Sequence, residues 1–280
     1  MLPMGWANSV PVFYDNITYI LQDEILHNML FYIDDTAIKG PRTWYLDANG
    51  NPKVHPVNPS IRWAIYEFFQ VVNWVLQCIK YSGGTFSGKK LVLCMETFTV
   101  LGHLCMPSGQ IPSESKLAVL ENWGPCQMIL ELRMFLRTIG VLWIFIKNFA
   151  HCAHYLIKFT YKDTVFEFGP EQHASQLDII AALCHAQPLV PINYNSDDLV
   201  ILAVDTSYIA IGFFLCQADL ADCQKRRYNW FGSIMLNDQE FHFSQLKLEF
   251  YGLYHVLGAL CLYVIGIQNL VVKVNACYIK

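Results

Sequence analysis

The stretch Phe31-Tyr32-Ile33-Asp34-Asp35 decides how this chain is best interpreted. Residues 31–33 predict the end of a buried strand, and the two adjacent Asp residues predict a tight turn, where Asp tolerates unusual backbone angles. Both carboxylates would then project from one end of a sheet. Carboxylate oxygens are hard ligands that suit Mg²⁺, and paired metal ions held in this way serve phosphoryl transfer. The alternative is an ordinary Asp-Asp turn that ends a strand.

Motifs on both sides of this turn favour the metal-binding interpretation. Upstream, residues 2–13 read Leu-Pro-Met-Gly-Trp-Ala-Asn-Ser-Val-Pro-Val-Phe, and downstream residues 100–103 read Val-Leu-Gly-His. In order and spacing they resemble the Leu-Pro-Phe-Gly-Leu-x-Asn-Ala-Pro-x-x-Phe and Phe-Leu-Gly-His motifs that flank the Tyr-x-Asp-Asp turn in reverse transcriptases of gypsy-class LTR retrotransposons. The resemblance runs almost from end to end, with thumb-like segments at residues 111–116, 122–125, 132–136 and 145–150.

The resemblance implies roles for the residues of these motifs. Asp34 and Asp35 would be the polymerase carboxylates that hold Mg²⁺. Contacts to a template-primer of RNA or DNA would come from the turn and the flanking motifs, at Gly5, Tyr32, Leu101, Gly102 and His103.

The last third carries a second set of carboxylates. Residues 200–207 and 210–217 predict two apolar strands with Asp205 near the end of the first, and residues 243–253 open a long helix that contains Glu249. These segments resemble a fused ribonuclease H domain, which implies that Asp205 and Glu249 are catalytic metal ligands acting on an RNA–DNA hybrid. The strand at 270–276 is similar to the one that ends in the family's third Asp, but Asn275 stands there. Without the family, Asp205 is a strand-end residue and Glu249 a solvated helix residue.

These anchors predict an α/β (α+β) fold of three parts. Residues 1–107 would be a partial polymerase palm, with a helix at 61–81. Residues 108–195 would be a helical thumb and connector, and residues 196–280 a C-terminally truncated ribonuclease H-like mixed sheet with helices. A polar, proline-bearing insertion at 41–59 contains the turn-forming Asp47-Ala48-Asn49-Gly50 and has no function assigned by the resemblance.

Charge and hydropathy indicate which partners the chain is suited to bind. The formal net charge of −4 does not favour tight binding to a nucleic acid, which prefers a positive groove. The apolar stretch 139–157 is interrupted by polar residues and predicts a buried amphipathic helix. The apolar stretch 250–267 is nearly long enough to cross a bilayer, yet its three glycines and its place in the resemblance favour burial in the core, so we expect no membrane segment.

The ten cysteines predict reduced thiols. None forms a Cys-x-x-Cys pair, and Met1 leads directly into Leu-Pro-Met-Gly rather than a basic and then apolar leader. We therefore expect no secretory signal and a cytoplasmic or nuclear location. His151 and His154, one helical turn apart, are the alternative start of a zinc site, but no second pair of matching ligands accompanies them.

Departures from the family pattern predict that the chain is inactive alone. A further palm Asp and the finger residues would lie before residue 1, and a fourth ribonuclease carboxylate would lie beyond Lys280. Six arginines against ten cysteines, seven tryptophans and nine histidines suggest cytosine-to-thymine decay of Arg codons, although packing of those side chains is the alternative explanation. Three hypotheses remain: a polyprotein fragment that is catalytic only within a longer chain, an inactive relic, and a recruited nucleic-acid-binding or interaction protein. The sequence leaves the oligomeric state undecided.

Overall fold

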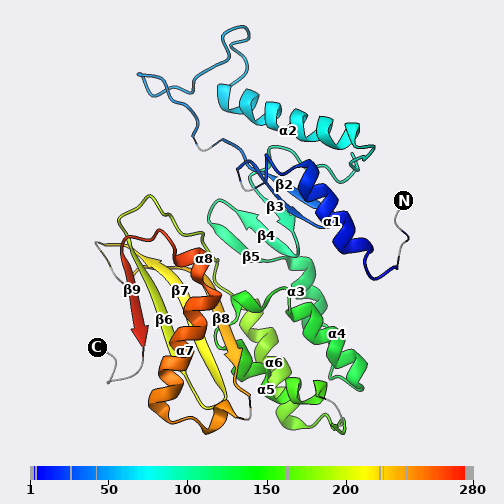
Figure 1. Cartoon of the computed structure of the whole chain (residues 1–280), viewed down its shortest axis with the longest axis vertical. Coiled ribbons are helices and arrows are strands. Elements are labelled where there is room, and N and C mark those ends of the chain that lie inside the picture. Colours follow the sequence, from blue (N-terminus) through cyan, green and yellow to red (C-terminus); the bar gives the residue numbers. More distant parts are fainter. Residues whose placement is uncertain are drawn as a thin grey trace. The chain divides into compact units, whose positions relative to one another are not determined.

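The computed structural model describes residues 3, 5–25, 27–41, 43–161, 164–220, 222, 224–237 and 239–274. The chain divides into two compact units, residues 1–94 and 95–280, and each is described by itself. Both contain helices and β-sheets (Figure 1), which confirms the predicted α/β fold class. The finer division at residues 107 and 195 stays a prediction.

The first unit is built from two helices and one β-hairpin. Its elements are α1 (Ser9–Ile20), β1 (Met29–Tyr32), β2 (Asp35–Ile38) and α2 (Trp63–Tyr81). The two strands pair antiparallel, and a small core forms where Met29 of β1 meets Leu21 and the α2 residues Val75 and Ile79. No residue of α1 is buried. The core of this unit is therefore short of apolar contacts.

The turn of the hairpin lies one residue earlier in the chain than the sequence predicts. The sequence analysis places Asp34 and Asp35 together in the turn, whereas Asp35 is the first residue of β2 and pairs with Tyr32. The turn residues are therefore Ile33 and Asp34. A two-residue hairpin loop needs a left-handed backbone, and Ile33 supplies it with φ of 56°. Because a β-branched residue rarely adopts that conformation, the turn is strained.

The insertion between β2 and α2 has the predicted turn. Asp47 accepts hydrogen bonds through Oδ1 from the backbone N–H groups of Asn49 and Asn51, at 2.9 and 2.8 Å. Gly50 in the same turn has φ of 81°. The helix that follows, α2, begins two residues after the predicted start and ends at the predicted residue.

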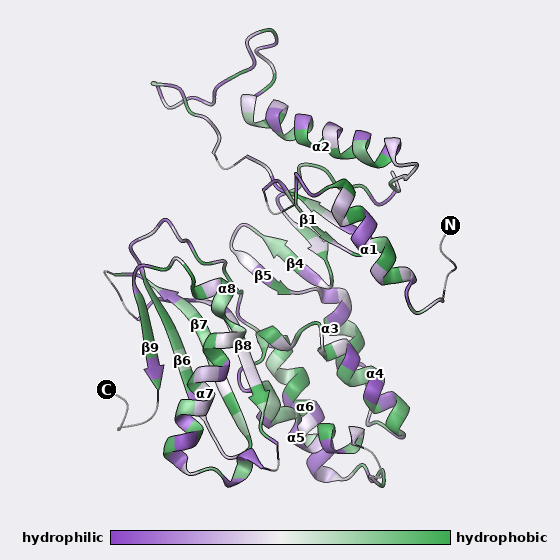
Figure 2. Ribbon diagram, viewed as in Figure 1, coloured by the Kyte–Doolittle hydropathy of each residue, from purple (hydrophilic) through white to green (hydrophobic). Residues whose placement is uncertain are grey.

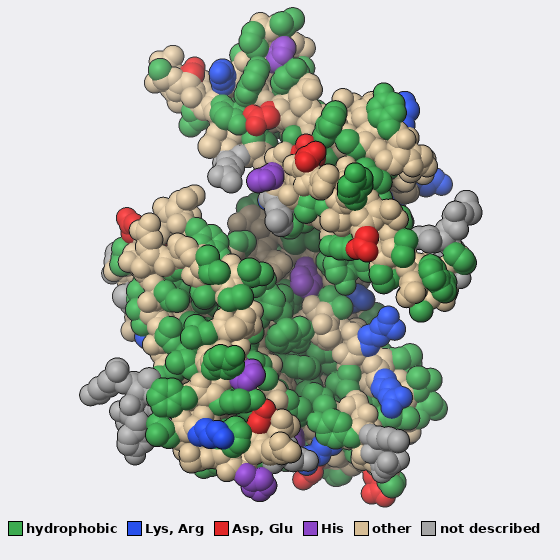
Figure 3. Space-filling model, in the orientation of Figure 1, with side chains coloured by type: hydrophobic (Ala, Val, Ile, Leu, Met, Phe, Trp, Pro, Cys, Tyr) green, Lys and Arg blue, Asp and Glu red, His purple; other side chains and the backbone are tan. Residues whose placement is uncertain are grey.

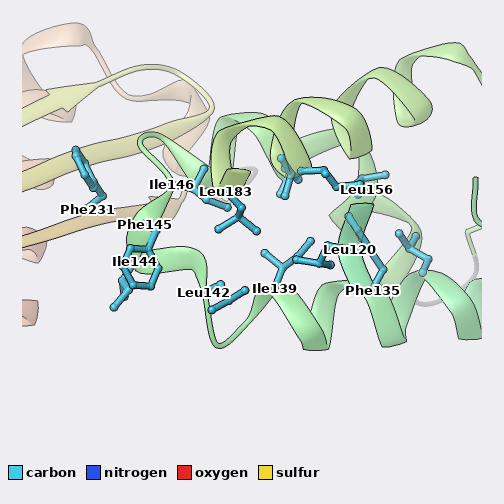
Figure 4. Packing of buried hydrophobic residues seen from close by; sticks show 14 of the residues in the cluster. Leu120, Phe135, Ile139, Leu142, Ile144, Phe145, Ile146, Leu156, Leu183 and Phe231 are labelled. Carbon is cyan, nitrogen blue, oxygen red and sulfur yellow. The ribbon is translucent and has the colours of Figure 1, made fainter. Parts of the chain in front are cut away.

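The first half of the second unit is a small antiparallel sheet followed by helices. Its elements are β3 (Phe98–Val100), β4 (His103–Met106), β5 (Gly109–Pro112), α3 (Glu114–Glu121), α4 (Ile129–Ile139), η1 (Trp143–Phe145), α5 (Phe149–Ile157), η2 (Lys158–Thr160) and α6 (Pro170–Cys184). Helix α4 buries Leu132, Phe135 and Ile139, which recur at helical spacing on one face. They pack against Leu156 of α5 and Leu183 of α6 in the largest core cluster (Figure 4).

The second half is a four-stranded mixed sheet with a helix on one face. Its elements are β6 (Leu199–Thr206), β7 (Ala210–Ala218), β8 (Arg226–Met235), η3 (Glu240–His242), α7 (Gln245–Ala259), α8 (Cys261–Val264) and β9 (Leu270–Val274). The strand order is β8-β7-β6-β9, and only β9 runs parallel to its neighbour. Leu202 and Val204 of β6 pack against Val256 of α7, and hydrophobic and hydrophilic residues alternate around that helix (Figure 2).

Two apolar stretches are broken where the sequence predicts continuous helices. Between α4 and α5 the chain leaves the helical path, and Asn148, just before α5, has a left-handed backbone with φ of 56°. The stretch 250–267 is divided at Leu260 into α7 and α8. Over the described residues, no helix combines the length and the apolar character that crossing a membrane requires.

Candidate functional site

The carboxylates of the β1–β2 turn are exposed and stand as a pair. Asp34 lies in the turn and Asp35 begins β2, directly opposite Tyr32. Within the part of the chain that the structure describes, no group of three or more His, Cys, Asp or Glu side chains is arranged to hold one metal ion. Two carboxylates are fewer ligands than a complete Mg²⁺ site has, and binding of Mg²⁺ by Asp34 and Asp35 stays a prediction.

Gly5 and Tyr32 lie in the same unit as this carboxylate pair. Gly5 has a left-handed backbone with φ of 90°, in the turn that precedes α1. Tyr32 ends β1 and is 56% exposed, so its ring is available to a ligand at the carboxylate turn. Leu2 and Met4 of the upstream motif lie outside the described residues.

The downstream motif forms the turn between β3 and β4. Leu101 and Gly102 have φ of 52° and 81° between the paired residues Val100 and His103, as a two-residue hairpin loop of the primed type requires. The exposed side chain of Lys116 lies beside Gly102, since a Cβ there would be 3.3 Å from Lys116 Cε. The turn is thus well defined and has a cation next to it.

His103 serves this turn as an anchor. Its Nε2 lies 3.0 Å from the carbonyl oxygen of Val141, and its ring packs edge-on against Phe145 at 5.3 Å between centroids. These contacts tie the hairpin to η1. The residue that resemblance assigns to nucleic-acid contact therefore also has a structural role.

Glu249 is the most unusual carboxylate of the second unit. It is 3% exposed and lies on the face of α7 that covers the sheet. Its Oε1 accepts a hydrogen bond of 3.0 Å from Gln245 Nε2, but its Oε2 has no hydrogen-bond partner among the described residues. Burying such an oxygen without a partner is costly. A cation bound there would supply the missing interaction.

Asp205 lies at the same end of the sheet as Glu249. Asp205 is exposed, whereas the next residue, Thr206, is buried beneath α7. Gly252 of α7 is the point of closest approach, because a Cβ at that position would lie 2.4 Å from Thr206 Oγ1. Glu249 is one helical turn before Gly252, towards the helix N-terminus, and this places it at the carboxyl end of β6.

The third predicted ligand, Asn275, lies outside the described residues. The strand that leads to it is present as predicted: β9 runs parallel to β6, and its last described residue, Val274, pairs with Val204. Whether Asp205, Glu249 and Asn275 bind one metal ion together stays a prediction.

Sequence reasoning missed the residues that support Glu249. Thr206 contributes a buried hydroxyl without a hydrogen-bond partner among the described residues, Gln245 holds one carboxylate oxygen, and Gly252 lets the helix approach the strand. Only Gly252 left a signal in the sequence, since a glycine inside a long helical pattern usually has a packing reason.

The cysteine and histidine predictions can be located as well. The cysteines that the structure describes are all free. His154 Nδ1 is buried without a hydrogen-bond partner in the described region, and burial, followed by the charges of Lys158 and His151, lowers the pKa of its imidazole. No third described ligand joins the two histidines.

Comparison with known proteins defines the class of the fold. No protein-family model matches the sequence. The chain is similar to the foamy viral protease-reverse transcriptase in complex with an RNA/DNA hybrid, with a TM-score of 0.69 and 17% identity over 98% of this chain and 33% of that chain. It is also similar to that protein in complex with dsDNA, with a TM-score of 0.69 and 16% identity over 99% of this chain and 52% of that chain. For the dRH form of that protein in complex with ds DNA, the TM-score is 0.68 at 17% identity. The similarity covers 98% of this chain and 43% of that chain.

These likenesses show that the chain has a reverse transcriptase-like fold. The chain spans between a third and about half of the length of the foamy viral structures. At this low identity the likeness establishes the fold, while activity and substrates are matters for proposal.

Proposed function

We propose that this chain is the reverse transcriptase and ribonuclease H-like region of a gypsy-class LTR retrotransposon polyprotein, a fragment that binds a template-primer or an RNA–DNA hybrid and is not catalytic alone. The observation that carries the proposal is the reverse transcriptase-like fold over 98% of the chain. The foamy viral proteins with that fold are bound to an RNA/DNA hybrid or to double-stranded DNA.

The positions of the motif residues support this proposal. Asp34 and Asp35 lie at a strained hairpin turn, and Leu101 and Gly102 form a second hairpin turn beside Lys116. Residues held in strained backbone conformations cluster at functional sites. The two motifs were recognised from residue order, and both coincide with tight turns.

The ribonuclease H-like part of the proposal rests on the environment of Glu249. Its buried Oε2, which has no hydrogen-bond partner in the described part of the chain, lies at the carboxyl end of β6, the end that also carries Asp205. Bound Mg²⁺ would supply charge neutralisation for a reacting phosphate. The chain's own contribution would be to orient Glu249 through Gln245 and to exclude water from one of its oxygens.

Two carboxylates at each place support the proposed inactivity. A two-metal clamp needs ligands for both ions, and the described residues contain no group of three. Full-length chain should therefore extend a primed RNA template with Mg²⁺ or Mn²⁺ no faster than buffer does. Extension that disappears in Asp34→Asn would refute inactivity but not the fold.

The binding part is tested by fluorescence anisotropy with a blunt RNA–DNA hybrid. We expect salt-sensitive binding, because phosphate contacts release counterions. Lys116→Ala should weaken hybrid binding by a few fold and reduce the slope of log affinity against log salt by roughly the value of one phosphate contact. Lys80→Ala, which removes another exposed lysine, should change neither. A chain that fails to bind the hybrid at low salt would overturn the proposal.

The second candidate is a recruited, non-catalytic nucleic-acid-binding or interaction protein. The same incomplete carboxylate sets favour it. The genomic sequence on either side separates the two: an in-frame continuation that supplies the family's further carboxylates favours the polyprotein fragment, and intervening stop codons do not.

A further inference from the structure

The insertion between β2 and α2 has an ordered structure that the proposed function does not use. Leu46 pairs with Pro52 and Val54 with Arg62 in isolated antiparallel bridges. The backbone N–H of Trp63 also donates to the carbonyl oxygen of Lys53 at 2.8 Å, which joins the insertion to the first residue of α2. Such pairing constrains the backbone of the insertion.

One side of this insertion contains an open hollow with an aromatic wall. It is a shallow, open depression of about 560 Å³ rather than an enclosed cavity. The hollow is lined by Thr43, Trp44, Tyr45, Leu46, Pro52 and Arg62. Trp44 is 58% exposed, and the Arg62 guanidinium lies 5.8 Å from the centre of its ring. The part of Figure 3 where the insertion lies shows exposed hydrophobic side chains, with basic and acidic side chains beside them.

A second aromatic group lies on the same insertion. His55 stacks on Trp63 at 5.9 Å between centroids and contacts Tyr66 at 4.4 Å. The Lys53 ammonium lies 5.4 Å from the centre of the Trp63 ring. We call Trp44, Arg62, Lys53, His55 and Trp63 the aromatic platform. It pairs two cations with aromatic faces.

The charges of this region leave those cations available. Asp47 is occupied by the backbone N–H groups of its own turn, as described above. Glu67 accepts a hydrogen bond from the Tyr45 hydroxyl, which raises the pKa of that tyrosine. Within the described residues, neither Lys53 nor Arg62 forms an ion pair with a carboxylate. The platform is therefore complementary to an anion that carries flat rings.

We propose that the aromatic platform binds single-stranded nucleic acid, with a base stacked on Trp44 in the hollow and the adjoining phosphate near Arg62. A single strand exposes base faces and phosphates together, whereas a duplex hides the faces within its stack. The surface lies outside both carboxylate sites, so this inference does not depend on catalysis or on hybrid binding. A proline-rich peptide would use the aromatic wall without the cations, and the test distinguishes it.

The test is anisotropy of a labelled single strand of about 12 nucleotides, within the usual site size. The protein is the full chain carried on a solubilising fusion. Trp44→Ala should weaken binding about tenfold through loss of stacking, and Trp44→Phe should retain most of it. Arg62→Ala should also weaken binding and lower the salt slope by about 0.7, the value for one phosphate contact on a single strand.

Trp74→Ala is the matched control, because Trp74 is a similarly exposed tryptophan on α2, at 54%. It should bind the strand as wild type does, and Trp44→Ala should bind a blunt RNA–DNA hybrid as wild type does. The inference is overturned if the wild-type chain does not bind the strand, if Trp44→Ala is unchanged, or if Trp74→Ala loses as much. Binding of a polyproline peptide by a chain that ignores the oligonucleotide would overturn it as well. If the chain fails to bind the hybrid but Trp44→Ala still weakens binding of the single strand, the result would count against the proposed function and not against this inference.

Discussion

The two units of this chain differ in how much apolar surface they bury. In the first unit, the core cluster contains Leu21, Met29, Val75 and Ile79, and α1 buries no residue. In the second unit, α4 alone buries three residues within a cluster that joins several helices, and a separate cluster lies between the sheet and α7. The carboxylate turn at Asp34 therefore belongs to a unit with a small apolar core, and Glu249 belongs to a unit with a larger one.

This difference matters for function because a metal site needs ligands that are already in position. A hairpin with one small core cluster is marginal in water, since two strands alone rarely fold. A helix packed along a sheet holds its side chains more firmly. The candidate site around Glu249 should consequently be the better preserved of the two.

The largest expected effect is a contrast between the units expressed separately. Residues 95–280 should unfold in one cooperative transition, whereas residues 1–94 should show no cooperative transition and should associate through exposed apolar side chains. Differential scanning calorimetry and sedimentation measure both. The full chain should need a solubilising fusion for the same reason. A sharp melt of monomeric 1–94 would contradict the contrast.

Next in size is a pair of core truncations in the full chain. Phe135→Ala should cost about 3–5 kcal/mol, because its fully buried ring leaves a cavity. Phe13→Ala, on the half-open face of α1 at 40% exposure, should cost under about 1 kcal/mol. Urea unfolding followed by circular dichroism measures the difference. Equal losses would show that α1 is packed as firmly as α4.

A smaller effect tests the contact that positions Glu249. Gly252→Ala should destabilise the second unit by about 1–3 kcal/mol, because the new Cβ would meet Thr206 Oγ1. Thr206→Ala should relieve most of that loss, so the double variant should be less affected than the sum of the two changes. Gly258→Ala is the control: nothing lies within 4 Å of its Cβ, and it should stabilise α7 slightly. Additive losses would argue against a direct contact.

The smallest effect concerns pH. The hydroxyl of Tyr251 donates a hydrogen bond to Glu240, and this bond, with one from the Asn237 backbone, lowers the pKa of Glu240 below its ordinary 4.5. A lowered carboxyl pKa gives stability that is complete above the unfolded value and is lost as the pH falls through the folded value. Tyr251→Phe should therefore flatten the loss of melting temperature on acidification below about pH 4.5. If the melting temperature of Tyr251→Phe falls with acidification as that of the wild type does, the hydrogen bond contributes little to stability.

The sequence predicted the elements that follow from local pattern. The helix α2, the turn at Asp47 and the strands β6 and β7 agree with periodicity and turn chemistry, whereas the strand β9 was expected from the family resemblance. The breaks at Asn148 and Leu260 were not predictable in this way, because they depend on tertiary packing that overrides an apolar run.

At the candidate sites, sequence identified carboxylates but not their surroundings. The turn contains Ile33 and Asp34 rather than Asp34 and Asp35 because Tyr32 pairs with Asp35. This strand register cannot be predicted from the local sequence alone. The burial of Glu249, its hydrogen bond from Gln245 and the approach of Gly252 to Thr206 depend on how α7 crosses the sheet. A motif gives the residue type, and the fold gives the environment that decides what the residue can do.

The most direct test of the proposed function is survival of the RNA strand in an RNA–DNA hybrid. Full chain and hybrid are incubated with Mg²⁺, and bound and cleaved fractions are measured on native and denaturing gels. We predict a bound hybrid with intact RNA, because under our proposal Asp205 and Glu249 would be too few ligands for the metal pair that cleavage needs. Cleavage by the unmodified chain that is abolished by Asp205→Asn would contradict the proposal that this fragment binds without catalysing.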